Sequence, residues 1–510
     1  MKKFVRTKKI NGKEYEYEIT PYYDPATKKV KQHSKYLGVK VDGQISKVRV
    51  PKLEEIISYG EFLPLLKMIE EYNLEKFLTD LLGEEDSHAV LTLSMFKLLT
   101  HLAFQDTSTW YKSSYLLQLY GDLPLSSQKI SKLLEKIGNK NINYELSKHI
   151  IPLLSSKHTI FYDITSISSF SEKLQMLEWG YNRDGYDLAQ VNLSVMIDKS
   201  EGIPVSYELY PGSISDVKTI QNTMKRICKI GITDYTLVLD RGFYSNTNIE
   251  DLINSKEKFI IALPERYTVV DSLLREKSIS ITNVNKGVLF ENELLFVEPV
   301  TIDTGTHPLK AYIYYAPQRA QKEEDNFYKR LIQKRKKIEE IKDITKLEEK
   351  AKDILGELYK YFNIIIEGKT VKININDDLV KQRTQKQGMF IIAYSDNFTW
   401  DEVLSIYRSK QLIEMSFDIL KNDLDISTPQ DHKTETLRGL LFISFIALIF
   451  HMRILKLLKD NKLQAEFSFD RVILELQKLK IVCYENGDNI KNETTKKQRD
   501  LLKLWNIVTN

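Results

Sequence analysis

The order of apolar segments after His158 most constrains what this chain can fold into. Three strand-like runs come first, TIFYDIT, QVNLSVMID and PVSYELYPG, and then a helix around KTIQNTMKRICKIG. The run YTLVLD, the helix NTNIEDLINS and the run FIIALP follow. Three strands followed by alternating helices and strands are typical of a mixed sheet with helical crossovers. The order predicts an RNase H-like fold for this segment.

The sequence on either side of that pattern divides the 510-residue chain into further domains. We predict a multidomain α/β protein whose RNase H-like mixed-sheet catalytic core is interrupted by an inserted domain. The predicted parts are a basic β-rich N-terminal region (1–50), an all-α domain expected to bind DNA (51–157), the first part of the core (158–265), an inserted domain of strands and charged helices (266–387), the second part of the core (388–455) and a helical C-terminal region (456–510).

Positive charge is concentrated at the beginning of the chain. Residues 1–50 contain 13 Lys and Arg against 5 Asp and Glu, although the whole chain has a net charge of only +4. A concentrated basic segment is the expected footprint of a polyanion such as DNA. On charge alone, a solvated lysine-rich surface explains the segment equally well.

Cysteine usage and the length of the apolar runs indicate a cytoplasmic protein. Cys228 and Cys483 are far apart and suit neither a disulfide framework nor a zinc cluster. The N-terminal segment lacks the apolar stretch of a signal peptide. The longest apolar run, Gly439 to Phe450, has twelve residues, fewer than the roughly 18 to 20 that span a membrane. We therefore expect a buried core helix there and no membrane association.

Two aspartates follow strand-like runs of the predicted core. Asp163 ends or nearly ends TIFYD, and Asp240 ends YTLVLD. Because these strands are neighbours in the proposed fold, we expect the two carboxylates to converge at a site for a hard metal cation. Two acids alone are also consistent with the carboxylate pair of a glycosidase. Each aspartate taken singly is consistent with a helix cap or a turn.

A predicted helix over residues 401–424 carries polar residues at regular spacing. Tyr407, Glu414 and Lys421 are seven residues apart, and Lys410 is four residues before Glu414, so all four share one face. Considered without the rest of the chain, this polar stripe is more typical of the solvent-exposed side of a helix than of a functional site.

The chain resembles the DDE transposases of bacterial insertion sequences, in the branch marked by a Tyr-x2-Arg-x3-Glu-x6-Lys signature. Tyr407, Glu414 and Lys421 match that signature, and Lys410 stands where arginine is usual. Lysine keeps the charge but loses the planar fork that grips a phosphate through two bonds. Three further stretches carry the resemblance, FYDIT, GYNRDG…GIPVSYELYPGSISD and DRGFYSN, with Ser213 where Asn often follows the glycine of PGS. The match covers residues 158 to about 455.

The resemblance implies a DNA transposase that cuts and joins DNA at one site. Two Mg²⁺ ions, for which Mn²⁺ can substitute, would be held by Asp163, Asp240 and Glu414. The DNA backbone would be held by Tyr407, Lys410, Lys421 and Arg241. The enzyme would bind the terminal inverted repeats of its element, hydrolyse the DNA ends and join the 3′-hydroxyls to double-stranded target DNA. Because two ends must be brought together, we expect a homodimer in the synaptic complex, acting near the bacterial nucleoid.

Three alternatives stay open at this point. One is a metal-dependent DNA nuclease without strand transfer, and another is a sugar-cleaving enzyme without a metal. The third is a domesticated, non-catalytic DNA-binding protein, although all three acids are present. Trp179 and Trp400 are candidates for stacking on a flipped base, and ordinary core or rim positions explain both tryptophans better.

The sequence after the second acid also makes a local prediction. Gly242 is expected to let the chain turn sharply away from Asp240. Phe243 and Tyr244 would then pack under a helix that begins near Asn246.

Overall fold

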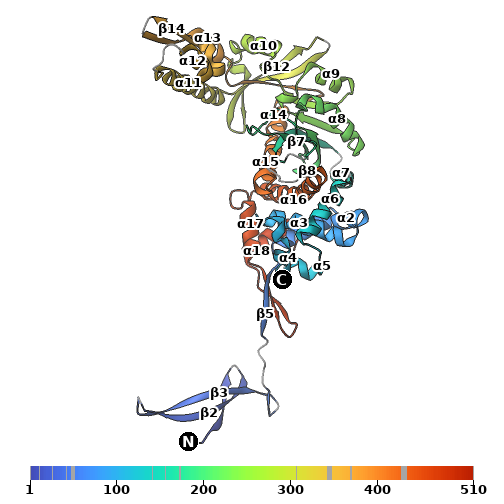
Figure 1. Ribbon diagram of the computed structural model, residues 1–510, viewed down its shortest axis with the longest axis vertical. Coiled ribbons are helices and arrows are strands. Elements are labelled where there is room, and N and C mark those ends of the chain that lie inside the picture. The colour runs from blue at the N-terminus through green and yellow to red at the C-terminus, as the bar shows by residue number, and fades with distance from the viewer. Residues whose placement is uncertain are drawn as a thin grey trace. The chain divides into compact units, whose positions relative to one another are not determined.

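The computed structural model describes most of the chain and divides it into two compact units (Figure 1). The described residues are 2–10, 12–25, 27–41, 43–46, 52–140, 142–154, 157–171, 174–305, 307–341, 347–367, 370–426 and 433–508. One unit comprises Met1–Leu63 with Leu474–Asn510, and the other comprises Pro64–Ile473. The predicted boundary between the basic region and the all-α domain falls in residues 47–51, which lie outside the described residues.

The smaller unit is built mainly from antiparallel strands. Its N-terminal sheet has the order β1 (Phe4–Ile10), β2 (Lys13–Asp24), β3 (Lys29–Val41) and β4 (Gln44–Ser46). A second sheet joins β5 (Leu53–Ser58) to β17 (Lys480–Tyr484) and β18 (Asn489–Lys491). The C-terminal region contains helices, as predicted, in α17 (Phe469–Leu476) and α18 (Lys496–Leu502). The hairpin β17–β18 was not predicted, because its strands are too short to show a clear alternation.

The larger unit begins with the predicted helices. They are α1 (Phe62–Glu71), α2 (Leu74–Leu82), α3 (Glu84–Leu99), α4 (Thr107–Lys112), α5 (Leu116–Tyr120), α6 (Ser127–Gly138) and α7 (Ile142–Ile150). The long helix α16 (Thr434–Asp460) packs against α3, α6 and β8. A Cβ atom at Gly439 would collide with the Leu134 carbonyl group of α6, so glycine permits this close approach. By length and composition α16 could cross a membrane, but most of its apolar residues are buried inside the protein, as expected for a core helix.

A nine-stranded sheet forms the centre of the larger unit, in the order β11-β12-β13-β16-β10-β9-β6-β7-β8. Its strands are β6 (His158–Ser168), β7 (Gln190–Asp198), β8 (Ile203–Pro211), β9 (Tyr235–Leu239), β10 (Lys258–Ala262), β11 (Gly287–Phe290), β12 (Glu293–Asp303), β13 (Pro308–Tyr315) and β16 (Met389–Tyr394). Strands β6, β7 and β8 form an antiparallel meander, whereas β9 runs parallel to β6 and β10 runs parallel to β9. Helices α8 (Asp216–Lys229) and α9 (Asn246–Asn254) make the crossovers. This is the predicted RNase H-like topology.

The segment from 266 to 387 has two structurally different halves. Its strands β11, β12 and β13 continue the central sheet, because β13 pairs with β16 and β16 pairs with β10. The other half has its own core, which includes Phe327, Leu331 and Tyr361. That half comprises α11 (Pro317–Glu339), α12 (Leu347–Leu355), β14 (Phe362–Glu367), β15 (Thr370–Ile375) and α13 (Asp377–Thr384). The helix α10 (Thr268–Ser278) packs on β12 and β16.

Candidate active site

The pairing of β6 with β9 sets the two aspartates side by side. Tyr162 is opposite Leu239 in the last register pair of these parallel strands, and Asp163 and Asp240 are the next residue on each strand. The structure therefore brings the two acids together as predicted. The expectation that the first strand ends at Asp163 is wrong: β6 continues to Ser168, because its other edge stays paired with β7 beyond the end of β9.

The segment that carries the third acid is not one regular helix. It consists of α14 (Trp400–Arg408), α15 (Gln411–Asp418) and a π-helical turn over Ile419–Asp423. At the break the Lys410 amide donates to the Tyr407 carbonyl, three residues back, at 3.0 Å. The prediction of a single helix is thus wrong, because α15 packs on β6 and β7 and the chain adjusts to that packing. The acid at 414 still reaches the two aspartates.

The ammonium group of Lys410 lies among all three acids. Its Nζ is 3.0 Å from Asp240 Oδ2, and it is 3.6 Å from both Asp163 Oδ2 and Glu414 Oε1. The lysine side chain is only 11% exposed, whereas the glutamate side chain is 63% exposed. Three carboxylates from three separate segments therefore surround one positive charge.

The second oxygen of each aspartate is held by other donors. The Ile164 amide donates to Asp163 Oδ1 at 2.9 Å, and the Arg241 amide donates to Asp240 Oδ1 at 2.7 Å. The Tyr407 hydroxyl also donates to Asp240 Oδ1, at 3.2 Å. Both aspartate side chains are thereby oriented with one oxygen turned toward the lysine.

The pKa values of these groups reflect burial working against charge pairing. Burial raises the pKa of the Asp163 carboxyl to about 6, and Lys410 offsets this only in part. Burial also acts to raise the pKa of Asp240, but Lys410, a backbone amide and the Tyr407 hydroxyl outweigh it, and the pKa lies below its usual value. Burial acts to lower the pKa of Lys410, and the carboxylates raise it above its usual value. The set thus favours a bound cation.

The donors of this set suit Mg²⁺, which prefers carboxylate oxygens. Within the described residues, no three acidic, histidine or cysteine side chains stand close enough together to form a ready-made metal site. The three carboxylates are instead gathered around Lys410, so a cation of their own is already present. A divalent ion held by Asp163, Asp240 and Glu414 requires the lysine ammonium to move away.

The remaining predicted contacts lie around this cluster. Lys421 is bound by another acid, since its Nζ donates to both carboxylate oxygens of Asp184 at 2.7 and 2.6 Å. The side chain of Arg241 has no ion-pair partner in the part of the chain that the structure describes. It lines a cavity of about 560 Å³ together with the two aspartates, Arg266 and Arg383. We name this space the acid-side cavity.

The predicted turn after Asp240 is present and its two aromatic residues are buried, but glycine is not the cause of the turn. Phe243 and Tyr244 are buried, and α9 begins at Asn246, as expected. Gly242, however, lies in a short 3₁₀ turn and is not among the residues with positive φ. The turn therefore does not depend on the backbone freedom of glycine.

A network around Arg183 was not predicted as part of the site. The Arg183 guanidinium pairs with Asp216 and donates to Ser166 Oγ at 3.2 Å and to Asn192 Oδ1 at 3.4 Å. It joins the GYNRDG loop to the segment after PGS, and the neighbouring residue Asp184 holds Lys421. The only sequence signal for this network was the pair of motifs themselves, GYNRDG and PGSISD.

The two tryptophans differ in their surroundings. Trp179 is 66% exposed, in the loop that precedes Arg183. Trp400 packs edge-on against Phe290 with ring centroids 6.0 Å apart, and its carbonyl accepts a hydrogen bond from Tyr314. Only Trp179 thus presents much of its ring to solvent.

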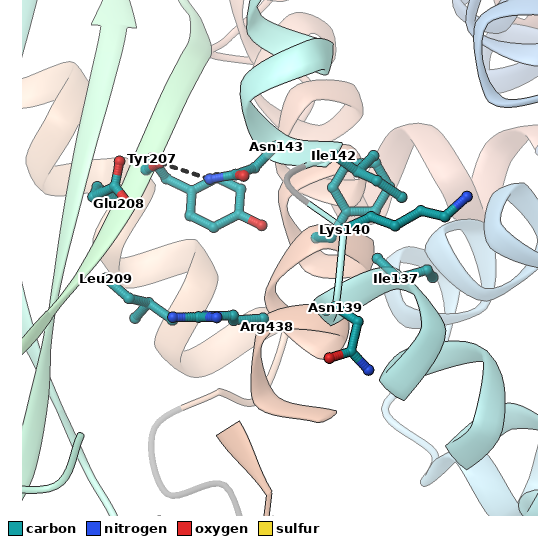
Figure 2. A pocket seen from close by; sticks show the side chains of 11 residues that line it. Ile137, Asn139, Lys140, Ile142, Asn143, Tyr207, Glu208, Leu209 and Arg438 are labelled. Atoms are coloured by element: carbon teal, nitrogen blue, oxygen red, sulfur yellow. Dashed lines mark hydrogen bonds between the residues drawn. The ribbon is translucent and has the colours of Figure 1, made fainter. Parts of the chain in front are cut away.

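Another cavity, of about 240 Å³, lies where α6, α7, β8 and α16 meet (Figure 2). The Asn143 side chain donates to the Tyr207 carbonyl at 3.2 Å across it, and Arg438 lines it from α16. None of the predicted site residues, all of which the structure describes, lines this cavity. It is therefore separate from the candidate active site.

Comparison with known proteins bears on this arrangement. A family model described as "Transposase DDE domain" matches residues 155–450, more than half of the chain and the part that holds all three acids. A comparison with curated proteins gives no match.

Two solved structures are similar to the chain at low identity. A piggyBac transposase synaptic complex with hairpin DNA is 10% identical, with a TM-score of 0.37 and coverage of 83% of this chain and 82% of that one. A Drosophila P element transposase strand transfer complex is 11% identical, with a TM-score of 0.22 and coverage of 78% and 87%. Similarity at this level carries no conclusion about the activity of this chain.

Proposed function

We propose, from the fact that the chain belongs to the transposase DDE domain family, that it is a cut-and-paste DNA transposase of a bacterial insertion sequence. It would bind the terminal inverted repeats of its element, hydrolyse the DNA at each end and join the freed 3′-hydroxyls to target DNA. The assignment to an insertion sequence rests on the spacing of Tyr407, Glu414 and Lys421. Since two ends must be joined, a homodimer would assemble on the DNA.

The observation that carries the proposal is the convergence of Asp163, Asp240 and Glu414 on one cation. Phosphodiester cleavage develops negative charge on the attacking and leaving oxygens, and it requires concentrated positive charge at that point. When bound, Mg²⁺ or Mn²⁺ supplies that charge and activates the attacking water. A glycosidase pair would need neither a third acid nor a lysine between the carboxylates.

The other residues of the cluster would act on the acids and on the DNA. The Tyr407 hydroxyl orients Asp240, because it donates to the oxygen that faces away from the lysine. Lys410, once it leaves the carboxylates, would be within reach of a phosphate bound at the same place. Arg241 would contact the backbone from the acid-side cavity, and Lys421 would do so after release from Asp184.

The direct test is incubation of the purified protein with Mg²⁺ and DNA that carries the ends of its element, with the products resolved strand by strand. We expect Asp163→Asn to abolish cleavage and to leave DNA binding largely intact, because the amide cannot replace the charged ligand. A variant that cuts the ends at the normal rate would remove Asp163 from the site. Cleaved ends without any joined product would instead identify a nuclease that performs no strand transfer.

A further inference from the structure

A third cavity, of about 410 Å³, lies between α10 and the helical half of the inserted segment, and its lining is strongly basic. Five of the lining side chains are cationic, against two carboxylates: Arg275, Arg330, Lys360, Arg383 and Lys386. We name this space the basic groove. Like charges crowded into one space repel one another, so such a lining is stabilised by a bound anion.

The basic groove and the acid-side cavity share a residue. Arg383, on α13, lines both of them. Asp163 and Asp240 also line the acid-side cavity. Cationic side chains therefore continue from the candidate active site onto the inserted helices, with Arg383 at the junction.

The acids near that junction are already engaged. Arg383 donates to Glu265 at 2.9 Å, and Lys386 pairs with Asp271. Arg275 donates to the same aspartate at 2.8 Å. These pairs hold the wall of the basic groove in place and engage Asp271, one of its two lining carboxylates, whereas the other, Glu357, is exposed.

Two cations of the basic groove have no such partner. Arg330, on α11, and Lys360, in the turn before β14, are both exposed, and neither has a carboxylate partner in the described part of the chain. The Lys360 ammonium lies over the Tyr361 ring, 5.3 Å from its centroid. Their charges are available to a ligand that enters the groove.

We propose that the basic groove binds the phosphate backbone of the DNA strand that runs out of the active site, with Arg330 and Lys360 as its principal contacts. The inference rests on the proposed function, because that function places a phosphodiester at Asp163 and Asp240. A DNA strand is the occupant that fits, because it presents phosphates at regular intervals to both cavities, which share Arg383. The inserted helices thus extend the DNA-binding surface beyond the reacting phosphate.

The test compares two double variants by their affinity for DNA as a function of salt concentration. Arg330→Gln/Lys360→Gln removes the two unpaired charges. The matched control, Arg335→Gln/Lys352→Gln, removes two charges from the same half of the inserted segment. These two residues are paired within their own helices with Glu339 and Glu348, at 2.8 and 3.2 Å. We expect only the first variant to lose affinity, with a slope of log K against log salt that is shallower by about 1.8, or roughly 0.9 for each lost phosphate contact.

A second DNA makes the test specific for the groove. On a duplex truncated close to the reacting phosphate on both sides, the first variant and the wild type are expected to bind equally well. Equal affinity and equal salt slope of the two double variants on long DNA would overturn the proposal. That failure is distinct from failure of the proposed function, which would show as normal cleavage by Asp163→Asn whatever the behaviour of the groove variants.

Discussion

Replacing Lys410 by methionine tests whether the ammonium group of this lysine neutralises the three acids in the metal-free protein. Methionine keeps much of the length and the apolar stem of lysine but removes the ammonium group. In the structure that group is 3.0 Å from Asp240 and 3.6 Å from both Asp163 and Glu414, with 11% of the side chain exposed. The variant leaves three carboxylates facing one another, so the metal-free protein should lose stability.

The expected loss in the free energy of unfolding can be estimated from how far the carboxylates around Lys410 are exposed to water. Removing one member of a buried ion pair costs about 3–5 kcal/mol. Here water reaches Asp240, which is 34% exposed, and Glu414, which is 63% exposed, and this offsets part of the repulsion. Asp163, whose pKa burial raises to about 6, takes up a proton readily. We therefore expect a loss in the free energy of unfolding at or below the lower end of that range, about 2–3 kcal/mol.

The assay is thermal unfolding of the full chain near neutral pH, with and without Mg²⁺. Without Mg²⁺ the midpoint of the larger unit, which spans Pro64–Ile473, should fall by about 2–4 °C. With Mg²⁺ the difference from the wild type should shrink, because the ion neutralises the carboxylates without having to displace a lysine. The control is Lys421→Met, which removes a lysine paired with Asp184 outside the acid cluster and should show no such Mg²⁺ dependence. A Lys410→Met protein that melts at the wild-type temperature without Mg²⁺, or that gains no more from Mg²⁺ than the control, would refute the reasoning.

Two further predictions concern the pH dependence of stability and the orientation of one acid. Burial lowers the pKa of His451 from 6.5 to about 4, so the folded state binds this proton less readily than the unfolded state, and stability should be lost as the pH falls from 6.5 to 4. Urea titrations across this range should show a smaller loss for His451→Leu, and an unchanged pH dependence would contradict the assignment. Tyr407→Phe deletes the hydroxyl that donates to Asp240, so cleavage should weaken while DNA affinity changes little; normal cleavage by this variant would show that the hydrogen bond has no role in the reaction.

The fold of the core could be predicted because its signal is local. Apolar runs and helical periods follow one another in an order that few sheets accommodate, and the observed pairing of β6 with β7 and β9 agrees with it. The attachment of β13 to β16 could not be predicted in the same way. Alternating residues indicate a strand but do not identify its partner, and these two strands are separated in sequence by the helical half of the inserted segment.

In the candidate active site, too, some features could be predicted from the sequence and others could not. Two aspartates that follow neighbouring parallel strands must lie close together, so their convergence follows from the predicted topology. The spacing of Tyr407 and Glu414 placed them on one side of a helix, and both do reach the cluster. The regular helix assumed for that argument is broken at Lys410, because packing of α15 on the sheet outweighs the local preference for an unbroken helix.

The sequence by itself determined which acids would come together and on which kinds of element they would stand, because hydrophobic period and motif spacing are properties of short stretches. The tertiary structure alone decided where the charges pair. It placed the Lys410 ammonium among the three acids, and it paired Lys421 with Asp184, 237 positions earlier in the chain. The physical reason is that electrostatic partners are chosen by distance and burial in the folded protein, which linear spacing does not encode.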